Sequence, residues 1–352
     1  LTQKFQYIKA FQNLFHGLTN IIKLINMYLI PFLYIVIVIP LFVLSKKFDL
    51  IDYPNERKKH SVPTPLIGGV TIFIIFYSYV FIYESNEKIL FLVISSTPIF
   101  IVSLIDDFKD ISSKLRLSVQ ALCATLIIIY GIEIDSIGYA ENLNLEIGIF
   151  SLFLTFFSII IFTNAFNFID GNDGLSSGYA LTFIIGLIGY SYFFGNPITN
   201  YSFYVLFILL ICFFIQNFFF TTTKIFLGDS GSNTIGFILA GYAIFYSSSN
   251  YMHFQPQLAV WPTALVIYDF TYLFIKRISE SKNPMQAGND HIHHSLLNYF
   301  SKKIVTLILI SLSLFFIIVG FLINKYFNIF FNFSIFIIFF IFYFLIRDQI
   351  LK

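Results

Sequence analysis

The sequence predicts an all-α integral membrane protein of about eleven transmembrane helices, with its N-terminus outside and its C-terminus in the cytoplasm. Of its 352 residues, 57% are hydrophobic and only 11% are charged, whereas about 25% are charged in an average soluble domain. Several charge-free stretches reach the roughly 20 residues that one helix needs to cross a bilayer, among them 24–45, 147–169 and 304–324. Such a chain has too little polar surface to cover a soluble core.

The apolar runs, each bounded by charged or turn-forming residues, define the expected spans. They lie at 24–45, 66–83, 89–105, 115–131, 147–168, 176–194, 201–220, 233–248, 257–275, 304–324 and 327–346. We expect residues 24–352 to form a single polytopic domain. Residues 1–23 carry apolar side chains at helical spacing, which predicts an amphipathic segment on the membrane surface. A start without regular structure is the alternative.

Lysine and arginine residues set the expected orientation, because they are enriched in cytoplasmic loops. With the N-terminus outside, all but five of the 21 lie on the cytoplasmic side, and the exceptions are Lys4, Lys9, Lys23, Lys88 and Lys325. The loops after the odd-numbered spans are then cytoplasmic, and three of them carry acidic motifs. The net charge of +2 does not indicate a nucleic-acid partner.

The first acidic motif follows the third span and contains Asp106, Asp107 and Asp110, with Lys114 and Arg116 shortly after. Adjacent carboxylates repel each other, so they are tolerated where a cation or a basic side chain compensates them. The motif therefore indicates a site for a cation or a basic partner. A solvated loop that caps the next helix is the alternative.

The second motif, NAFNFIDGNDGL at 164–175, ends the fifth span. Asn164 and Asn167 share a helix face at this spacing, which places two amide oxygens beside Asp170 and Asp173. Oxygen ligands of this kind suit Mg²⁺ or Mn²⁺ rather than zinc. A plain Asn/Asp/Gly turn before a helix is the alternative.

The third motif, LGDSGSN at 227–233, is expected to be a small-residue loop that opens the eighth span. Backbone N–H groups at a helix N-terminus form an anion site, and Asp229 beside them can hold a metal that bridges phosphates. Alone, this motif has little specificity. It becomes informative because it is expected to face the first and second motifs.

Histidines and basic residues form the fourth motif, with Arg277 followed by His291, His293 and His294. A zinc site would need a closed His/Cys set, and both cysteines of the chain lie in apolar stretches. Phosphate contact or packing at a helix end is the better interpretation. In the first cytoplasmic loop, 52–69, Pro and Gly residues around Lys59 indicate a shaped loop beside a site, with a plain basic anchor as the alternative.

Together these motifs predict a magnesium and phosphate site on the cytoplasmic surface of the membrane. Metal-assisted phosphoryl transfer to or from a lipid-borne acceptor is the reaction class that suits it. An ion-coupled transporter is the alternative from a different class, but its carboxylates should lie near the bilayer midplane. Asp269 is the one carboxylate inside a predicted span, and we expect it to pair with Lys276 or Arg277.

Five segments, in the same order, resemble the motifs of the polyprenyl-phosphate N-acetylhexosamine-1-phosphate transferase superfamily (glycosyltransferase family 4), and the resemblance extends from about residue 24 to 346. They are 52–69, 106–120, 164–175, 226–232 and 289–294. The resemblance implies transfer of a sugar 1-phosphate from a UDP-sugar to undecaprenyl phosphate or a related polyprenyl phosphate, with release of UMP and a need for Mg²⁺. It also implies a plasma (inner) membrane location and is compatible with a homodimer.

The same resemblance implies roles for individual residues. Asp106 and Asp107 would be the catalytic pair at the lipid phosphate, and Asn167 and Asp229 would be metal ligands. The substrate-binding residues would be Asp170, Asp173, Asn164, Lys59, Lys114, Arg277, His291, His293 and His294. A lipid phosphate is already a nucleophile, so direct in-line attack needs alignment and charge neutralisation more than a strong base. A two-step route through an acyl phosphate on Asp107 ranks second.

Two departures distinguish branches of this superfamily. The branch that acts on phospho-MurNAc-pentapeptide typically carries Lys at the position of Asp110, and three consecutive histidines where this chain has the sequence HIHH at 291–294. Both departures favour the branch that transfers GlcNAc 1-phosphate and starts lipid-linked glycans of the cell surface.

Overall fold

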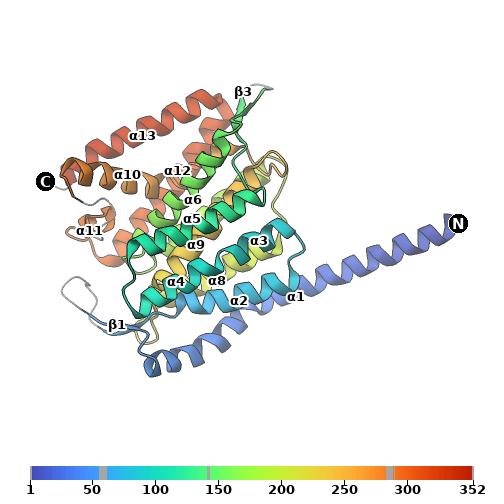
Figure 1. The fold of residues 1–352 in the computed structure, drawn as a ribbon, viewed down its shortest axis with the longest axis horizontal. Helices are drawn as coiled ribbons and strands as arrows, with labels where there is room; N and C mark the ends of the chain where they lie inside the picture. Colours follow the sequence, from blue (N-terminus) through green and yellow to red (C-terminus); the bar gives the residue numbers. More distant parts are fainter. Residues whose placement is uncertain (1, 55–61, 141–142, 283–287, 289, 351–352) are drawn as a thin grey trace.

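The computed structural model describes residues 2–54, 62–140, 143–282, 288 and 290–350, and these are mostly helical (Figure 1). The helices are α1 (Thr2–Lys47), α2 (Gly68–Tyr83), α3 (Glu87–Ser95), α4 (Thr97–Phe108), α5 (Ser113–Ile129), α6 (Phe150–Phe168), α7 (Leu175–Phe193), α8 (Tyr201–Phe219), α9 (Gly228–Ser247), α10 (Ala264–Ser279), α11 (Ile292–Leu296), α12 (Lys302–Tyr326) and α13 (Ile329–Ile350). A 3₁₀ turn, Pro256–Leu258, precedes α10. Two antiparallel hairpins, β1 (Ile51–Asp52) with β2 (Thr64–Pro65) and β3 (Ser136–Ala140) with β4 (Leu143–Glu146), lie in loops.

Length and composition make six helical segments of the described chain capable of crossing a membrane. They are Ile22–Lys47, Glu87–Phe108, Phe150–Phe168, Tyr201–Phe219, Lys302–Tyr326 and Ile329–Arg347. The prediction of a predominantly helical membrane protein is therefore confirmed. The hairpin β3–β4 was not predicted, and Figure 1 places it at the opposite end of the bundle from α11 and β1.

The structure adds detail to three predicted segments. The span at 89–105 is matched by the membrane-crossing segment Glu87–Phe108, which consists of two consecutive helices, α3 and α4, because Pro98 has no N–H with which to continue the helical ladder. The expected loop at 227–233 is the first turn of α9, which begins at Gly228. At the N-terminus, α1 is one continuous helix from Thr2 to Lys47, and Figure 1 shows its first half extending away from the other helices.

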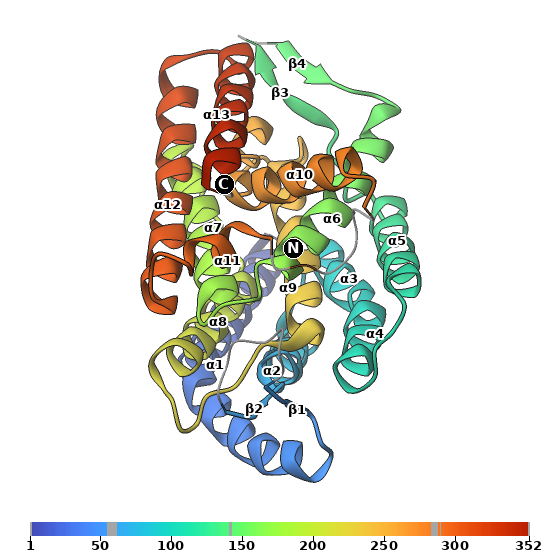
Figure 2. The same cartoon turned by 90° about the vertical axis from the view of Figure 1, so that its left-hand side faces the viewer.

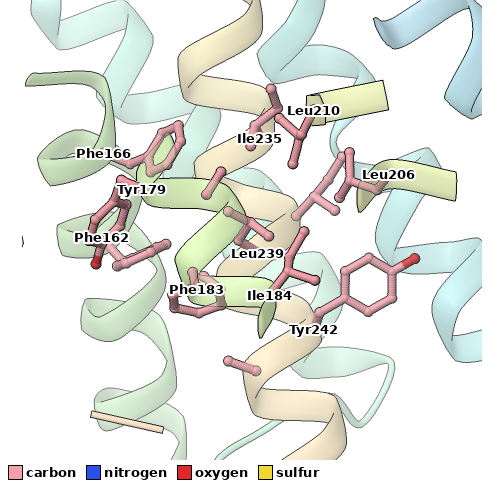
Figure 3. Close-up of a cluster of buried hydrophobic side chains, with 14 of the residues drawn as sticks. Phe162, Phe166, Tyr179, Phe183, Ile184, Leu206, Leu210, Ile235, Leu239 and Tyr242 are labelled. Carbon is pink, nitrogen blue, oxygen red and sulfur yellow. The ribbon is translucent and has the colours of Figure 1, made fainter. Parts of the chain in front are cut away.

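Helix α9 lies at the centre of the bundle, where it packs against α2, α4 and α6 (Figure 2). Its glycines make this possible. A Cβ on Gly236 would lie 3.1 Å from the Phe166 side chain and 3.2 Å from the backbone of Thr163. Large apolar side chains fill the core between α6, α7, α8 and α9 (Figure 3). They are Phe162, Phe166, Tyr179, Phe183, Ile184, Leu206, Leu210, Ile235, Leu239 and Tyr242. The first turn of α9 is thus held at the end of a closely packed core.

Close backbone contact between α2 and α9 leads to a stability prediction. The Gly69 N–H donates to the Leu227 carbonyl at 2.8 Å, and a Cβ on Gly69 would lie 2.8 Å from that oxygen and nearer still to the Gly231 backbone. We expect Gly69→Ala to lower the free energy of unfolding by about 1–3 kcal/mol, because the backbones would have to separate. Thermal unfolding of the purified protein measures this.

The matched control is Gly189→Ala on α7, where an added Cβ meets no atom within 4 Å. Alanine is favoured over glycine inside a helix by about 0.5–1 kcal/mol, so the control should melt at the wild-type temperature or slightly above it. Equal melting temperatures for the two variants would contradict the close packing described for α2 and α9.

Candidate active site

A cluster of charges forms where the end of α4 meets the starts of α5 and α9. One nitrogen of the Arg116 guanidinium, Nη1, lies 2.5 Å from Asp106 Oδ2 and 3.1 Å from Asp229 Oδ2. Asp106 also accepts a hydrogen bond from the Ile111 N–H at 2.6 Å, which closes the loop between α4 and α5. Arg116 therefore offsets the repulsion between two carboxylates that come from different helices.

Asp107 caps helix α9 from a neighbouring helix. Its two carboxylate oxygens accept the backbone N–H groups of Asp229 at 2.7 Å and Ser230 at 3.1 Å. Leu227, at the N-cap position of α9, offers no capping side chain, so a carboxylate from α4 satisfies the free N–H groups and the positive end of the helix dipole. Gly228 has a φ of +74° and no room for a side chain, since a Cβ there would lie 2.7 Å from Asp107 Oδ2.

The last turn of α6 brings the predicted metal ligands together. Asn167 donates from Nδ2 to Asp229 Oδ1 at 3.0 Å and to the Ser232 hydroxyl at 2.7 Å. Its amide oxygen is therefore oriented away from these two acceptors and can act as a ligand. Asn167 and Asp229 thus lie in direct contact although 62 residues separate them in the sequence.

Asn164, one turn earlier, takes part in helix packing. Its Nδ2 donates to Gln120 Oε1 at 2.6 Å and to the Ile160 carbonyl at 2.8 Å. Gln120 continues to Asn233 Oδ1 at 3.2 Å, and Asn233 donates to the carbonyl of Asp229 at 3.0 Å. This chain of amides ties α5, α6 and α9 together beneath the charge cluster.

The turn after α6 holds two further predicted carboxylates. Asp170 accepts a hydrogen bond from the Ser176 hydroxyl at 2.6 Å. Burial raises the pKa of Asp170 to about 7, with a smaller contribution from the nearby carboxylates of Asp229 and Asp173 and an opposing effect of the hydrogen bond from Ser176. Asp173 forms an ion pair with Lys224, in the loop before α9. Lys224 was not singled out in the sequence, although it is the one basic residue between α8 and α9.

The histidine motif approaches this turn from the opposite side. His293 is buried against Gly171. A Cβ added to Gly171 would lie only 2.5 Å from Nε2 of His293. Within the described residues neither ring nitrogen of His293 has a hydrogen-bond partner. Burial holds the pKa of His293 well below its usual range, and the neighbouring His294 and His291 act in the same direction. A buried imidazole with two unsatisfied nitrogens fits a place where a polar ligand binds.

Arg277 and the remaining histidines lie in the same motif. Arg277 is buried and binds both carboxylate oxygens of Asp290, at 3.0 Å and 2.5 Å. His294 lies with its ring 4.1 Å from that of His293, and His291 lies 5.1 Å from the ring of Phe168 at the end of α6. The expected pairing of Asp269 with Lys276 or Arg277 is wrong, because Asp269 binds His291 and Arg347 instead.

Two predicted basic residues are not part of these contacts. Lys59 lies outside the described residues. Lys114 is exposed, and its side chain has no ion pair in the described part of the chain, whereas Arg116 two residues later has two. The first loop does reach the site through β2, since Pro65 accepts the Phe226 N–H at 2.8 Å just before the third motif.

The donor set determines which metal the cluster could hold. No three His, Cys, Asp or Glu residues of the described chain gather as a ready-made metal cage. The available donors are oxygens, from Asp229, from the Asn167 amide and from the surrounding carboxylates. A hard cation that keeps several waters or phosphate oxygens in its shell suits such a partial set.

Comparison with known proteins supports the resemblance seen in the motifs. Residues 89–247 match the family described as glycosyl transferase family 4. Over 294 residues the chain is 30% identical to the undecaprenyl-phosphate alpha-N-acetylglucosaminyl 1-phosphate transferase of Thermotoga maritima, which covers 82% of this chain and 86% of that protein.

Proteins of the same name in two other bacteria are similar over comparable lengths. The protein of Escherichia coli K12 is 28% identical over 278 residues, which is 77% of this chain and 76% of the relative. That of Yersinia pestis is 28% identical over 290 residues, which is 78% of each chain. With an oxygen-rich cluster at one end of an apolar helical bundle, these similarities lead to one conclusion: the chain belongs to glycosyl transferase family 4.

Proposed function

We propose that this protein transfers N-acetylhexosamine 1-phosphate, with GlcNAc as the first candidate sugar, from a UDP-sugar to undecaprenyl phosphate or a related polyprenyl phosphate. The observation that carries the proposal is the contact of Asp107, Asn167 and Arg116 with Asp229 at one end of a membrane bundle. In such a site the membrane would supply the lipid phosphate and the aqueous side would supply the nucleotide. The names of the similar proteins indicate the same reaction.

A charge imbalance supports Mg²⁺, or Mn²⁺, as the cofactor. Asp106 and Asp229 share the guanidinium of Arg116, and Asp173 pairs with Lys224. Within the described residues Asp107 and Asp170 form no ion pair. The diphosphate of the UDP-sugar and the phosphate of the lipid would add to this negative charge. Asn167 and Asp229 would hold the ion, which would offset charge on the diphosphate and on the transferred phosphoryl group.

In the reaction we propose, an oxygen of the lipid phosphate attacks the β-phosphorus of the UDP-sugar. A new phosphorus–oxygen bond forms there, and the bond from the β-phosphorus to the bridging oxygen breaks, so that UMP leaves with that oxygen. Arg116 would hold Asp106 and Asp229 in place through its two ion pairs, and Asp107 would meet the acceptor phosphate. Alignment and charge neutralisation are the main contributions of the protein, because the attacking oxygen is already anionic.

The positive-inside distribution supports a cytoplasmic site, with the N-terminus outside and the C-terminus inside. Arg116, Lys224 and Arg277 all lie at this end of the bundle. The activated UDP-sugars of a bacterial cell would reach the site from that side.

The test uses purified protein with undecaprenyl phosphate, Mg²⁺ and a panel of UDP-GlcNAc, UDP-GalNAc and UDP-MurNAc-pentapeptide, and it measures UMP and the lipid product. We expect product with UDP-GlcNAc and none with UDP-MurNAc-pentapeptide. Omission of Mg²⁺ should reduce UMP release to background. No lipid product with any donor, together with solute flux in proteoliposomes, would favour a transporter and overturn the proposal.

A further inference from the structure

Asp269 is a buried carboxylate on α10 that lies outside the acidic cluster. Its side chain is only 2% exposed. It accepts hydrogen bonds from Nδ1 of His291 at 2.9 Å, from the Ile292 N–H at 3.1 Å and from the Tyr343 hydroxyl at 2.7 Å. Because a carboxylate with these donors acts only as an acceptor, Nδ1 of His291 must carry the proton in this contact.

Arg347, near the end of α13, holds the same segment from another side. Its side chain is fully buried, and Nε lies 3.6 Å from Asp269 Oδ1. Nη1 donates to the Ser295 hydroxyl at 2.9 Å, and Nη2 donates to the Asp290 carbonyl at 2.5 Å. A buried guanidinium is costly unless it is paired. Nη1 and Nη2 of Arg347 have hydrogen bonds, while Nε has none within the described residues and relies on the charge of Asp269. The segment 290–295, which we call the histidine segment, is thus joined to α10 by Asp269 and to α13 by Arg347.

The consequence is a fixed orientation of the His291 ring. Nδ1 is bound by Asp269, while Nε2 has no hydrogen-bond partner among the described residues. The ring lies between Phe168 of α6, at 5.1 Å, and the parallel ring of His293, at 5.9 Å. His291 thus joins the fourth motif to Phe168 of the second motif, and its Nε2 has no hydrogen bond within the described residues.

We propose that Asp269, Tyr343 and Arg347 are positioning residues that present His291 Nε2 to the diphosphate of the UDP-sugar. The inference rests on the proposed function, which supplies the donor. In the proposed function the lipid phosphate would meet the protein at Asp106 and Asp107, at the end of α4. We therefore expect Asp269, Tyr343 and Arg347 to affect binding of the UDP-sugar and not binding of the lipid phosphate.

Steady-state kinetics of Tyr343→Phe and Asp269→Asn test this separation. We expect the KM for UDP-GlcNAc to rise about three- to tenfold, the effect of one lost hydrogen bond, and the KM for undecaprenyl phosphate to stay unchanged. A purely structural defect would reduce the active fraction and leave both KM values alone. The matched control is Tyr190→Phe, which removes a buried hydroxyl that donates to the Ile317 carbonyl at 2.8 Å, away from the site.

A double-mutant cycle tests whether the network acts through His291. In a His291→Ala background, Tyr343→Phe should cause no further rise in the KM for UDP-GlcNAc, because the ring that it positions is gone. Effects that multiply would overturn the inference, and so would an unchanged donor KM in both single variants.

Calorimetric titration with UDP gives a readout that does not depend on turnover. The Kd for UDP should rise in Tyr343→Phe and stay unchanged in Tyr190→Phe. If the wild type binds UDP but makes no lipid product, the proposed function fails while the titration still decides the inference. An equal Kd for wild type and Tyr343→Phe would reject the inference alone.

Discussion

Replacing Asp229 with asparagine is expected to reduce UMP release by about 10²–10³-fold, the range typical for the loss of one group that stabilises charge in a transition state. Asp229 receives Arg116 at 3.1 Å and Asn167 at 3.0 Å, and its backbone N–H binds Asp107 at 2.7 Å. Among the described residues of the site, Asp229 is the one that contacts all three, Arg116 and Asn167 through its carboxylate and Asp107 through its backbone N–H. As a proposed metal ligand it also carries the charge that attracts the cation.

The Asp229→Asn variant should fold, because an asparagine side chain can still accept from Asn167 and the backbone cap is unaffected. The concentration of Mg²⁺ for half-maximal activity should rise by at least about tenfold, since one charged ligand is lost. A titration of activity with Mg²⁺ measures both effects.

The matched control for this change is Asp135→Asn. Asp135 accepts the Ser249 N–H at 3.1–3.2 Å on the far side of the bundle, beside the hairpin β3–β4. Its activity and its Mg²⁺ dependence should match those of the wild type. An Asp229→Asn protein with a normal Mg²⁺ requirement would show that the metal is held elsewhere.

Removing the guanidinium of Arg116 is the second change with a large expected effect. In Arg116→Met, Asp106 and Asp229 lose their shared partner, and hydrogen bonds to charged groups contribute about 1.5–3 kcal/mol each. We expect kcat to fall about 10–100-fold, because the two carboxylates would repel each other and Asp229 would leave its position. Arg116→Lys should be intermediate, since an ammonium restores the charge on a shorter side chain.

Lys114→Met provides the comparison for this result. Lys114 is also basic and belongs to the same motif, but its side chain is exposed. Activity close to wild type in Lys114→Met, with a large loss in Arg116→Met, would support the assignment of Arg116. Equal losses would mean that the substrate brings Lys114 into the site. The kinetics of UMP release with saturating UDP-GlcNAc measure both variants.

Much of the site could be predicted because its chemistry is local in the sequence. Asn167 and Asp170 are one turn apart, so helical periodicity places them near each other before any tertiary contact is known. The apolar runs on either side can only be helices in a membrane, since every backbone group must be satisfied within the segment. The sequence predicts a loop around Asp229, whereas the structure has the first turn of α9 there. No nearby residue signals the start of this helix, because its capping carboxylate comes from Asp107, far away in the sequence.

The sequence by itself determined the membrane class, the oxygen-rich character of the site and the acidic residues that compose it. These follow from composition and from patterns within one turn or one span. Only the tertiary structure decided that Arg116 rather than Lys114 joins Asp106 to Asp229, which lies 113 residues from Arg116 in the sequence. It also decided that Arg347 closes the histidine segment by reaching Asp290, across 57 residues. The physical reason is that periodicity defines which face of a helix is polar, whereas the packing of α4, α5, α9 and α13 selects which of those faces meet.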